Sequence, residues 1–114
     1  MDERRKSPRK ALYRYLEVVD SKSKRPVGRL VNLTPEGIML MSEKPFKEKA
    51  SFKLKVKLPE GVLNLKSITV DSECRWCATS VNPDYYDAGF EFTKVPGQSL
   101  EAIDFLLKFQ AFNS

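Results

Sequence analysis

The sequence contains no histidine, and only two cysteines occur among its 114 residues. A structural zinc site needs four cysteine or histidine ligands, which one copy of this chain cannot supply, so we predict no metal site. The two cysteines, Cys74 and Cys77, form a C-x-x-C within a predicted strand, whereas thioredoxin-like redox pairs lie at a helix N-terminus. Since residues three apart on a regular strand face opposite sides, we interpret both as small buried or half-buried hydrophobes.

The sequence also lacks the arrangements on which catalysis depends. It offers no nucleophile-and-base arrangement and no glycine-rich phosphate-binding loop of the P-loop type. Isolated carboxylates such as Asp84 and Asp87 fall in a predicted loop, where aspartate is an ordinary turn residue. We therefore predict that the chain is not an enzyme and has no catalytic residue and no cofactor.

Long hydrophobic runs and internal repeats are absent as well. No apolar stretch approaches the roughly 18 residues that a transmembrane helix needs, and the charged start of the chain leads into no signal-peptide core. Hydrophobic residues make up 41% of the chain and charged residues 31%, as in ordinary folded domains. These values and the length predict one cytoplasmic domain over residues 1–114.

Positive charge is concentrated at the N-terminus. Residues 1–14 carry six basic side chains against two acidic ones, which leaves +4 of the total formal charge of +5 in this segment. Residues 1–11 form a basic arm without a hydrophobic anchor. A local basic segment on a near-neutral body favours a site for a compact polyanion or a nucleic-acid backbone; a solvated, flexible tail is the alternative.

Short runs of apolar and polar residues predict a mainly β fold over residues 12–95. The clearest run is Phe52–Leu58, where apolar and basic residues alternate strictly; we interpret it as a half-buried strand whose lysines face solvent rather than nucleic acid. Further strands are expected at residues 12–19, 27–31, 38–41, 62–70, 72–79 and 88–92. Six or so short strands joined by turns predict a small antiparallel β-barrel, which we expect to be six-stranded.

Residues 99–112 are predicted to form a C-terminal helix. Ser99 is the expected N-cap, and Glu101 is expected in the first turn, where the helix dipole favours a negative charge. One apolar stripe consists of Leu100, Ile103, Leu106, Leu107 and Ala111, and a second consists of Phe105, Phe109 and Phe112. This apolar face is wider than packing on one barrel needs. The phenylalanine stripe therefore mediates a homodimer, docks on a partner protein, or folds over the barrel mouth as core.

Two short motifs about two dozen residues apart suggest a ligand site. The first, R-x-x-x-R, places two guanidinium forks at Arg5 and Arg9. The second, N-x-T-x-x-G, is a polar turn that runs from Asn32 through Thr34 to Gly37, where a ligand can approach the backbone closely. An arginine fork can bond a phosphate or the O6 and N7 edge of guanine. An asparagine amide offers a donor and an acceptor to a base edge, and a threonine hydroxyl can bond a phosphate oxygen.

The order and separation of these motifs resemble the PilZ domain, the bacterial receptor for cyclic di-GMP, whose signature is RxxxR followed by [D/N]x[S/T]xxG. The resemblance covers nearly the whole chain, including residues 88–92, which are similar to the family's late G-x-x-F strand. It implies that the arginines hold guanine and phosphate and that the polar turn completes the pocket. The residues assigned to the ligand in this way are Arg5, Arg9, Asn32, Thr34 and Gly37. Arg4, which precedes the first motif arginine, is a candidate third cation for the ligand; a solvated tail residue is the alternative.

The sequence departs from the family pattern at two points. Thr34 stands where serine is more frequent, which keeps the hydroxyl, and Glu36 would repel phosphates if its carboxylate pointed inward. As a mechanism, we expect the ligand to draw the arm over the barrel and so to change the surface shown to a partner. The regulated process would be motility, exopolysaccharide synthesis, biofilm formation or virulence.

Two alternatives remain open at this point. A degenerate PilZ-like module acting only through protein contacts would leave the intact arginine pair unexplained. A small β-barrel that binds single-stranded nucleic acid would use Tyr13, Tyr15 and Trp76 as stacking platforms, although such aromatic residues more often belong to the core.

Overall fold

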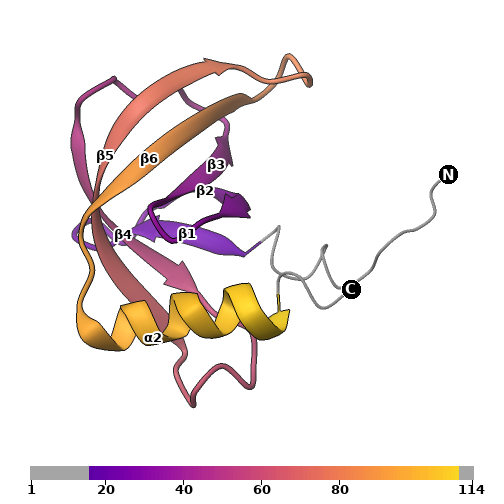
Figure 1. Cartoon of the computed structure of the whole chain (residues 1–114). Helices are drawn as coiled ribbons and strands as arrows, with labels where there is room; N and C mark the ends of the chain where they lie inside the picture. The colour runs from indigo at the N-terminus through magenta and orange to yellow at the C-terminus, as the bar shows by residue number, and fades with distance from the viewer. Residues whose placement is uncertain (1–15, 111–114) are drawn as a thin grey trace, which may run out of the picture.

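The computed structural model describes residues 16–110, with the side chains of residues 109 and 110 left out, so predictions for residues 1–15 and 111–114 lie outside the described part. Six antiparallel strands form a closed barrel in the order β1-β2-β3-β6-β5-β4 (Figure 1). Their bounds are β1 Glu17–Asp20, β2 Pro26–Leu33, β3 Gly37–Ser42, β4 Ser51–Lys57, β5 Ser67–Thr79 and β6 Tyr86–Lys94. The predicted six-stranded barrel is confirmed.

The short first strand closes the barrel. Val18 of β1 lies opposite Gly28 of β2 on one side and opposite Val56 of β4 on the other. Each strand therefore has two hydrogen-bonded neighbours, which leaves no open sheet edge among the described strands.

Strand β4 has the alternation that the sequence predicts. Leu54 and Val56 are buried, whereas Lys53 forms an ion pair of 3.9 Å with Asp71 and Lys57 one of 3.3 Å with Glu17. The lysine row is thus a solvated outer face balanced by neighbouring carboxylates.

The prediction of separate strands at 62–70 and 72–79 is wrong. Strand β5 is continuous from Ser67 to Thr79. Buried and partly exposed residues alternate from Ser67 to Cys74, and Asp71 points outward within this run. Residues 62–66 are not a strand: Leu63 and Asn64 have φ of 54° and 58°, a left-handed conformation that interrupts any extended segment.

Helix α2 runs over Gly97–Phe105 and continues as one π-helical turn, η1, over Leu106–Gln110. The predicted N-cap at Ser99 is wrong: the helix begins two residues earlier, after Pro96, and the buried Ser99 hydroxyl donates to the carbonyl oxygen of Thr69 on β5 at 2.8 Å. Glu101 consequently lies beyond the first turn, which contains no acidic residue. No helix of the described residues is long and apolar enough to cross a membrane.

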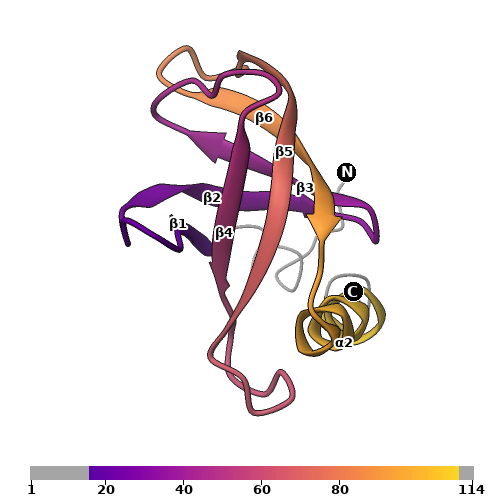
Figure 2. The same ribbon diagram turned by 90° about the vertical axis from the view of Figure 1, so that its left-hand side faces the viewer.

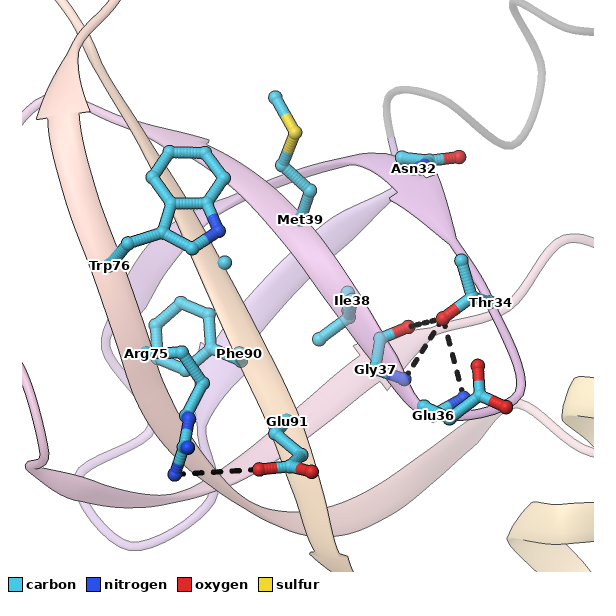
Figure 3. A pocket seen from close by; sticks show the side chains of 11 residues that line it. Asn32, Thr34, Glu36, Gly37, Ile38, Met39, Arg75, Trp76, Phe90 and Glu91 are labelled. Atoms are coloured by element: carbon cyan, nitrogen blue, oxygen red, sulfur yellow. Dashed lines mark hydrogen bonds and ion pairs between the residues drawn. The ribbon is translucent and has the colours of Figure 1, made fainter.

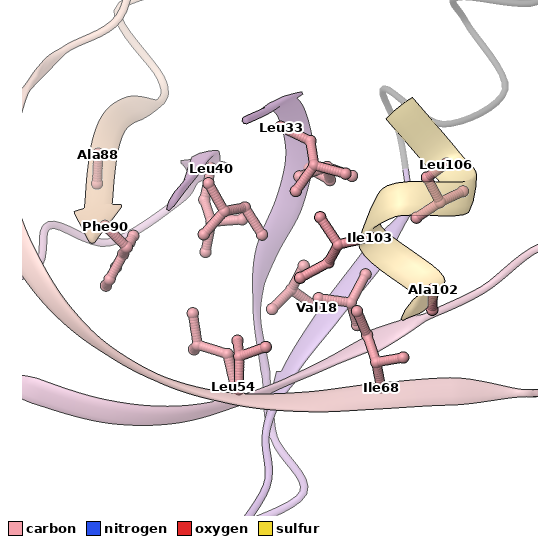
Figure 4. Close-up of a cluster of buried hydrophobic side chains, with 14 of the residues drawn as sticks. Val18, Leu33, Leu40, Leu54, Ile68, Ala88, Phe90, Ala102, Ile103 and Leu106 are labelled. Carbon is pink, nitrogen blue, oxygen red and sulfur yellow. The ribbon is translucent and has the colours of Figure 1, made fainter. Parts of the chain in front are cut away.

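The helix closes one end of the barrel. Its buried side chains Ala102, Ile103 and Leu106 join the core beside Val18 and Ile68 (Figure 4). This contact positions the helix without a side-chain cap.

The side chains of the two predicted apolar stripes differ in how far they are buried. Phe105 and Leu107 are half-buried and pack against the core, whereas Leu100, predicted to share a stripe with Ile103, is 53% exposed. The side chain of Phe109, like all of Phe112, lies outside the described part.

The β3–β4 loop packs against the far side of the barrel from α2 (Figures 1 and 2). Phe46 of this loop makes edge-to-face contacts with Phe52 and Phe90, at ring-centroid distances of 5.4 and 4.9 Å. Its backbone N–H donates to the sulfur of Cys77 at 3.4 Å. The loop is thereby fixed to the core and to β5.

The two cysteines face the same way, contrary to the prediction. A β-bulge between Cys74 and Trp76 adds a residue to β5, so that Cys74 is buried and Cys77 also packs against the core. Burial, and secondly the nearby Cys77 thiol, raise the pKa of the Cys74 thiol. Both thiols are free and serve as small hydrophobic side chains.

Candidate functional site

The turn between β2 and β3 is built by the hydroxyl of Thr34. Its Oγ1 accepts hydrogen bonds from the N–H groups of Glu36 at 3.3 Å and Gly37 at 3.1 Å (Figure 3). The backbone of Thr34 also donates to the carbonyl oxygen of Gly37 at 3.0 Å. The hydroxyl expected to meet a phosphate is therefore already engaged in shaping the turn.

Gly37 is required by the close approach of strand β6. It begins β3 opposite Glu91, and a β-carbon at this position would overlap the carbonyl oxygen of Phe90. Its backbone does not have the left-handed conformation that glycine favours, so the need is for space and not for an unusual φ. The glycine that ends the turn motif therefore reflects a packing constraint between two strands.

An open cavity of about 390 Å³ lies beside this turn, on the outer side of β3, β5 and β6 (Figure 3). Thr34 and Glu36 of the turn line one side, and Arg75 and Trp76 of β5 line the other. The remaining lining residues are Asn32, Gly37, Ile38, Met39, Gly89, Phe90 and Glu91. The three turn residues predicted to bind a ligand are thus brought together at one cavity.

Trp76 is the exposed aromatic residue of the site, whereas Phe90 is buried. The bulge turns its side chain outward over Gly89, and a β-carbon on that glycine would overlap the indole nitrogen. The side chain remains 42% exposed beside the cavity. An indole supported on a glycine backbone and open to solvent is a surface on which a flat base can stack.

The charges of the cavity are mixed. The Nη1 atom of Arg75 forms ion pairs with Glu73 at 2.9 Å and Glu91 at 3.4 Å. Glu36 and Glu91 both line the cavity, so its described lining holds two carboxylates against one guanidinium. An anionic ligand would need cations from outside this lining.

The predicted arginines lie outside the described part of the chain. The structure therefore places Asn32, Thr34 and Gly37 but not Arg4, Arg5 or Arg9. Arg75 and Glu91 belong to neither sequence motif, and the sequence suggests Trp76 only as a stacking platform for nucleic acid. Within residues 16–110, no group of three or more cysteine or acidic residues could hold a metal ion.

A family model described as the PilZ domain matches residues 3–109 of the chain. That match includes the positions of both the arginine motif and the polar turn. A search of curated proteins finds no similar sequence.

Several solved structures share the fold, among them the following three. The inhibitor of motility MotI/DgrA of Bacillus subtilis has a TM-score of 0.69 at 16% identity, over 88% of this chain and 48% of its own. K. pneumonia MrkH in its apo state has a TM-score of 0.68 at 18% identity, over 95% of this chain and 52% of its own. The PilZ domain of YcgR from Escherichia coli, solved with c-di-GMP, has a TM-score of 0.62 at 12% identity, over 84% of this chain and 80% of its own. The chain spans about half the length of MotI and MrkH.

Proposed function

The chain belongs to the PilZ domain family, and from this we propose that it is a receptor for cyclic di-GMP. The observation that carries the proposal is the cavity in which the family's polar turn faces an exposed tryptophan. A YcgR domain of the same fold has been solved with this ligand.

The ligand combines flat guanine bases with two phosphates, and the site supplies a partner for each. A guanine base stacks on Trp76, while Asn32 and the backbone of the turn bond its polar edge. Arg5 and Arg9 pair with phosphate and guanine, and Arg4 adds a third cation. Because the described lining holds more carboxylates than cations, the affinity for this anion depends on the arm.

Ligand binding then changes the surface of the domain. The ligand draws residues 1–11 over the barrel and orders them, which presents a new surface to a downstream protein. The regulated process is motility, exopolysaccharide synthesis, biofilm formation or virulence. Amide hydrogen exchange of residues 2–11 should slow when cyclic di-GMP is added; equal exchange with and without ligand would contradict this mechanism.

Isothermal titration calorimetry tests the receptor role. We expect saturable binding of cyclic di-GMP, with weaker binding of GMP and cyclic di-AMP. Arg9→Ala should weaken it by at least about tenfold, since a bidentate guanidinium contact to a charged group contributes about 1.5–3 kcal/mol. Lys10→Ala is the matched control, because it removes one arm charge outside the motif. No heat with any nucleotide would instead support the protein-interaction alternative.

A homodimer through the C-terminal helix is a separate proposal for the assembly. Leu100 is exposed on α2, but Phe105 already packs against the barrel core, so the phenylalanine stripe is not wholly available to a second copy. Sedimentation of a monomer at micromolar concentration would contradict the dimer.

A further inference from the structure

A second cavity, of about 840 Å³, lies at the opposite end of strands β2 and β3 from Trp76. We name it the hairpin groove. Its lining comes from the start of β2, the end of β3 and the loop that follows, with one residue each from β1 and the β5–β6 loop: Glu17, Arg25–Arg29, Met41–Phe46 and Tyr85. This volume is in the range of sites that enclose a small ligand or a few peptide side chains.

The middle of the hairpin groove is apolar. Val27, Met41 and Phe46 are half-buried there, and exposed Pro26 and Pro45 flank them. Gly28 also lines the groove, and a β-carbon at that position would lie 2.8 Å from the carbonyl oxygen of Met41 on the neighbouring strand. One aliphatic or aromatic side chain of a partner would find apolar contacts at this point.

The rim of the hairpin groove carries unbalanced positive charge. Arg25, Arg29 and Lys44 are exposed, and no carboxylate of residues 16–110 lies within ion-pair distance of them. Of the two acidic residues in the lining, Glu17 is paired with Lys57 at 3.3 Å. Three cations therefore face one carboxylate, Glu43, that has no ion pair within the described residues.

We propose that the hairpin groove docks an acidic segment of a protein partner. One apolar side chain of that segment enters the centre, and flanking carboxylates pair with Arg25, Arg29 and Lys44. The groove does not suit a nucleic-acid strand equally well, because Glu43 and Glu17 interrupt the positive rim that a run of phosphates needs. This site is distinct from the Trp76 cavity, and the proposal does not depend on cyclic di-GMP binding.

The test uses the full chain labelled with ¹⁵N and an acetylated peptide of sequence Glu-Asp-Phe-Asp-Glu. We expect saturable shifts of the amide signals of Val27, Gly28, Arg29, Met41 and Lys44 at roughly millimolar peptide. The uncharged peptide Gln-Asn-Phe-Asn-Gln should bind at least about fivefold more weakly if the rim cations contribute as charged pairs do. Octathymidylate is titrated in the same way to test binding of single-stranded nucleic acid.

Charge reversal identifies the residues that bind. Arg29→Glu should weaken binding of the acidic peptide at least about fivefold, whereas Lys22→Glu, an equal charge change outside the groove, should have little effect. The proposal is overturned by absent shifts at the groove, by equal binding of the two peptides, or by tighter binding of octathymidylate. Titration of the Arg29→Glu variant with cyclic di-GMP separates the two sites, because that binding should be unchanged.

Discussion

The indole ring of Trp76 lies directly over Gly89, in a contact so close that any larger residue at position 89 would displace the ring. The two residues are cross-strand partners because the bulge in β5 shifts the register between Cys74 and Trp76. The position of the aromatic surface at the candidate site is thus set by the backbone of β6.

Gly89→Ala should move the indole and weaken ligand binding. The new methyl group would overlap the ring, and the ring is the mobile partner, so we expect the fluorescence emission of this single tryptophan to shift. Loss of one base-stacking contact costs about 1–3 kcal/mol of binding free energy. Gly97→Ala is the control, since a β-carbon there meets nothing within 4 Å. Unchanged emission and affinity in Gly89→Ala would show that the ring does not depend on this glycine.

Gly37→Ala should destabilise the barrel itself. Its β-carbon would overlap a backbone carbonyl oxygen of β6, which cannot move away as a side chain can. We expect the free energy of unfolding in urea to fall by about 1–3 kcal/mol, the usual cost of overpacking. If the free energy of unfolding falls no more in Gly37→Ala than in Gly97→Ala, then β3 and β6 can move apart at this position without a loss of stability.

Thr34→Val and Thr34→Ser separate the hydroxyl from the methyl group. Valine removes the acceptor for the N–H groups of Glu36 and Gly37, so urea denaturation should show a loss of about 1 kcal/mol. Serine keeps the acceptor and should retain most of the stability. Equal losses in the two variants would assign the effect to packing instead of hydrogen bonding.

Glu36→Gln should strengthen binding of an anionic ligand. The carboxylate lines the cavity, so its removal lowers the repulsion of phosphates. We expect the Kd for cyclic di-GMP to fall about threefold, because a charge interaction at an exposed position contributes less than about 1 kcal/mol of binding free energy. Glu60→Gln, an exposed site outside the cavity, controls for net charge. Weaker binding of Glu36→Gln would show instead that the carboxylate accepts bonds from the guanine edge.

The two thiols should differ in reactivity. Burial raises the pKa of Cys74, so at pH 8 a disulfide reagent should modify Cys77 first and Cys74 only after urea is added. An unfolded thiol ionises near pH 8.5, whereas the folded Cys74 keeps its proton to higher pH. The protonated Cys74 thiol therefore makes its full contribution to the free energy of unfolding below about pH 8.5. That contribution is lost as the pH rises through the higher pKa of the folded state. Equal rates for both thiols in the folded protein would contradict this account.

The sequence predicted those parts of the fold that depend on residues close together in the chain. The alternation of Phe52–Leu58 located β4, and the turn motif placed Thr34 beside Gly37 because those residues are neighbours in sequence. The contact of Trp76 with Gly89 depends on strand register, which a single extra residue shifts. The helix start was missed for a related reason, since Ser99 bonds a carbonyl of a distant strand instead of capping its own helix.

We propose that the cavity between the β2–β3 turn and Trp76 binds cyclic di-GMP. The most direct measurement is a ¹H–¹⁵N spectrum of the labelled chain during addition of this ligand. We expect saturable shifts of the Trp76 indole N–H and of the amides of Glu36 and Gly37, while the amide of Gly28 stays in place. Absence of any shift, or shifts confined to residues outside this cavity, would contradict this proposal.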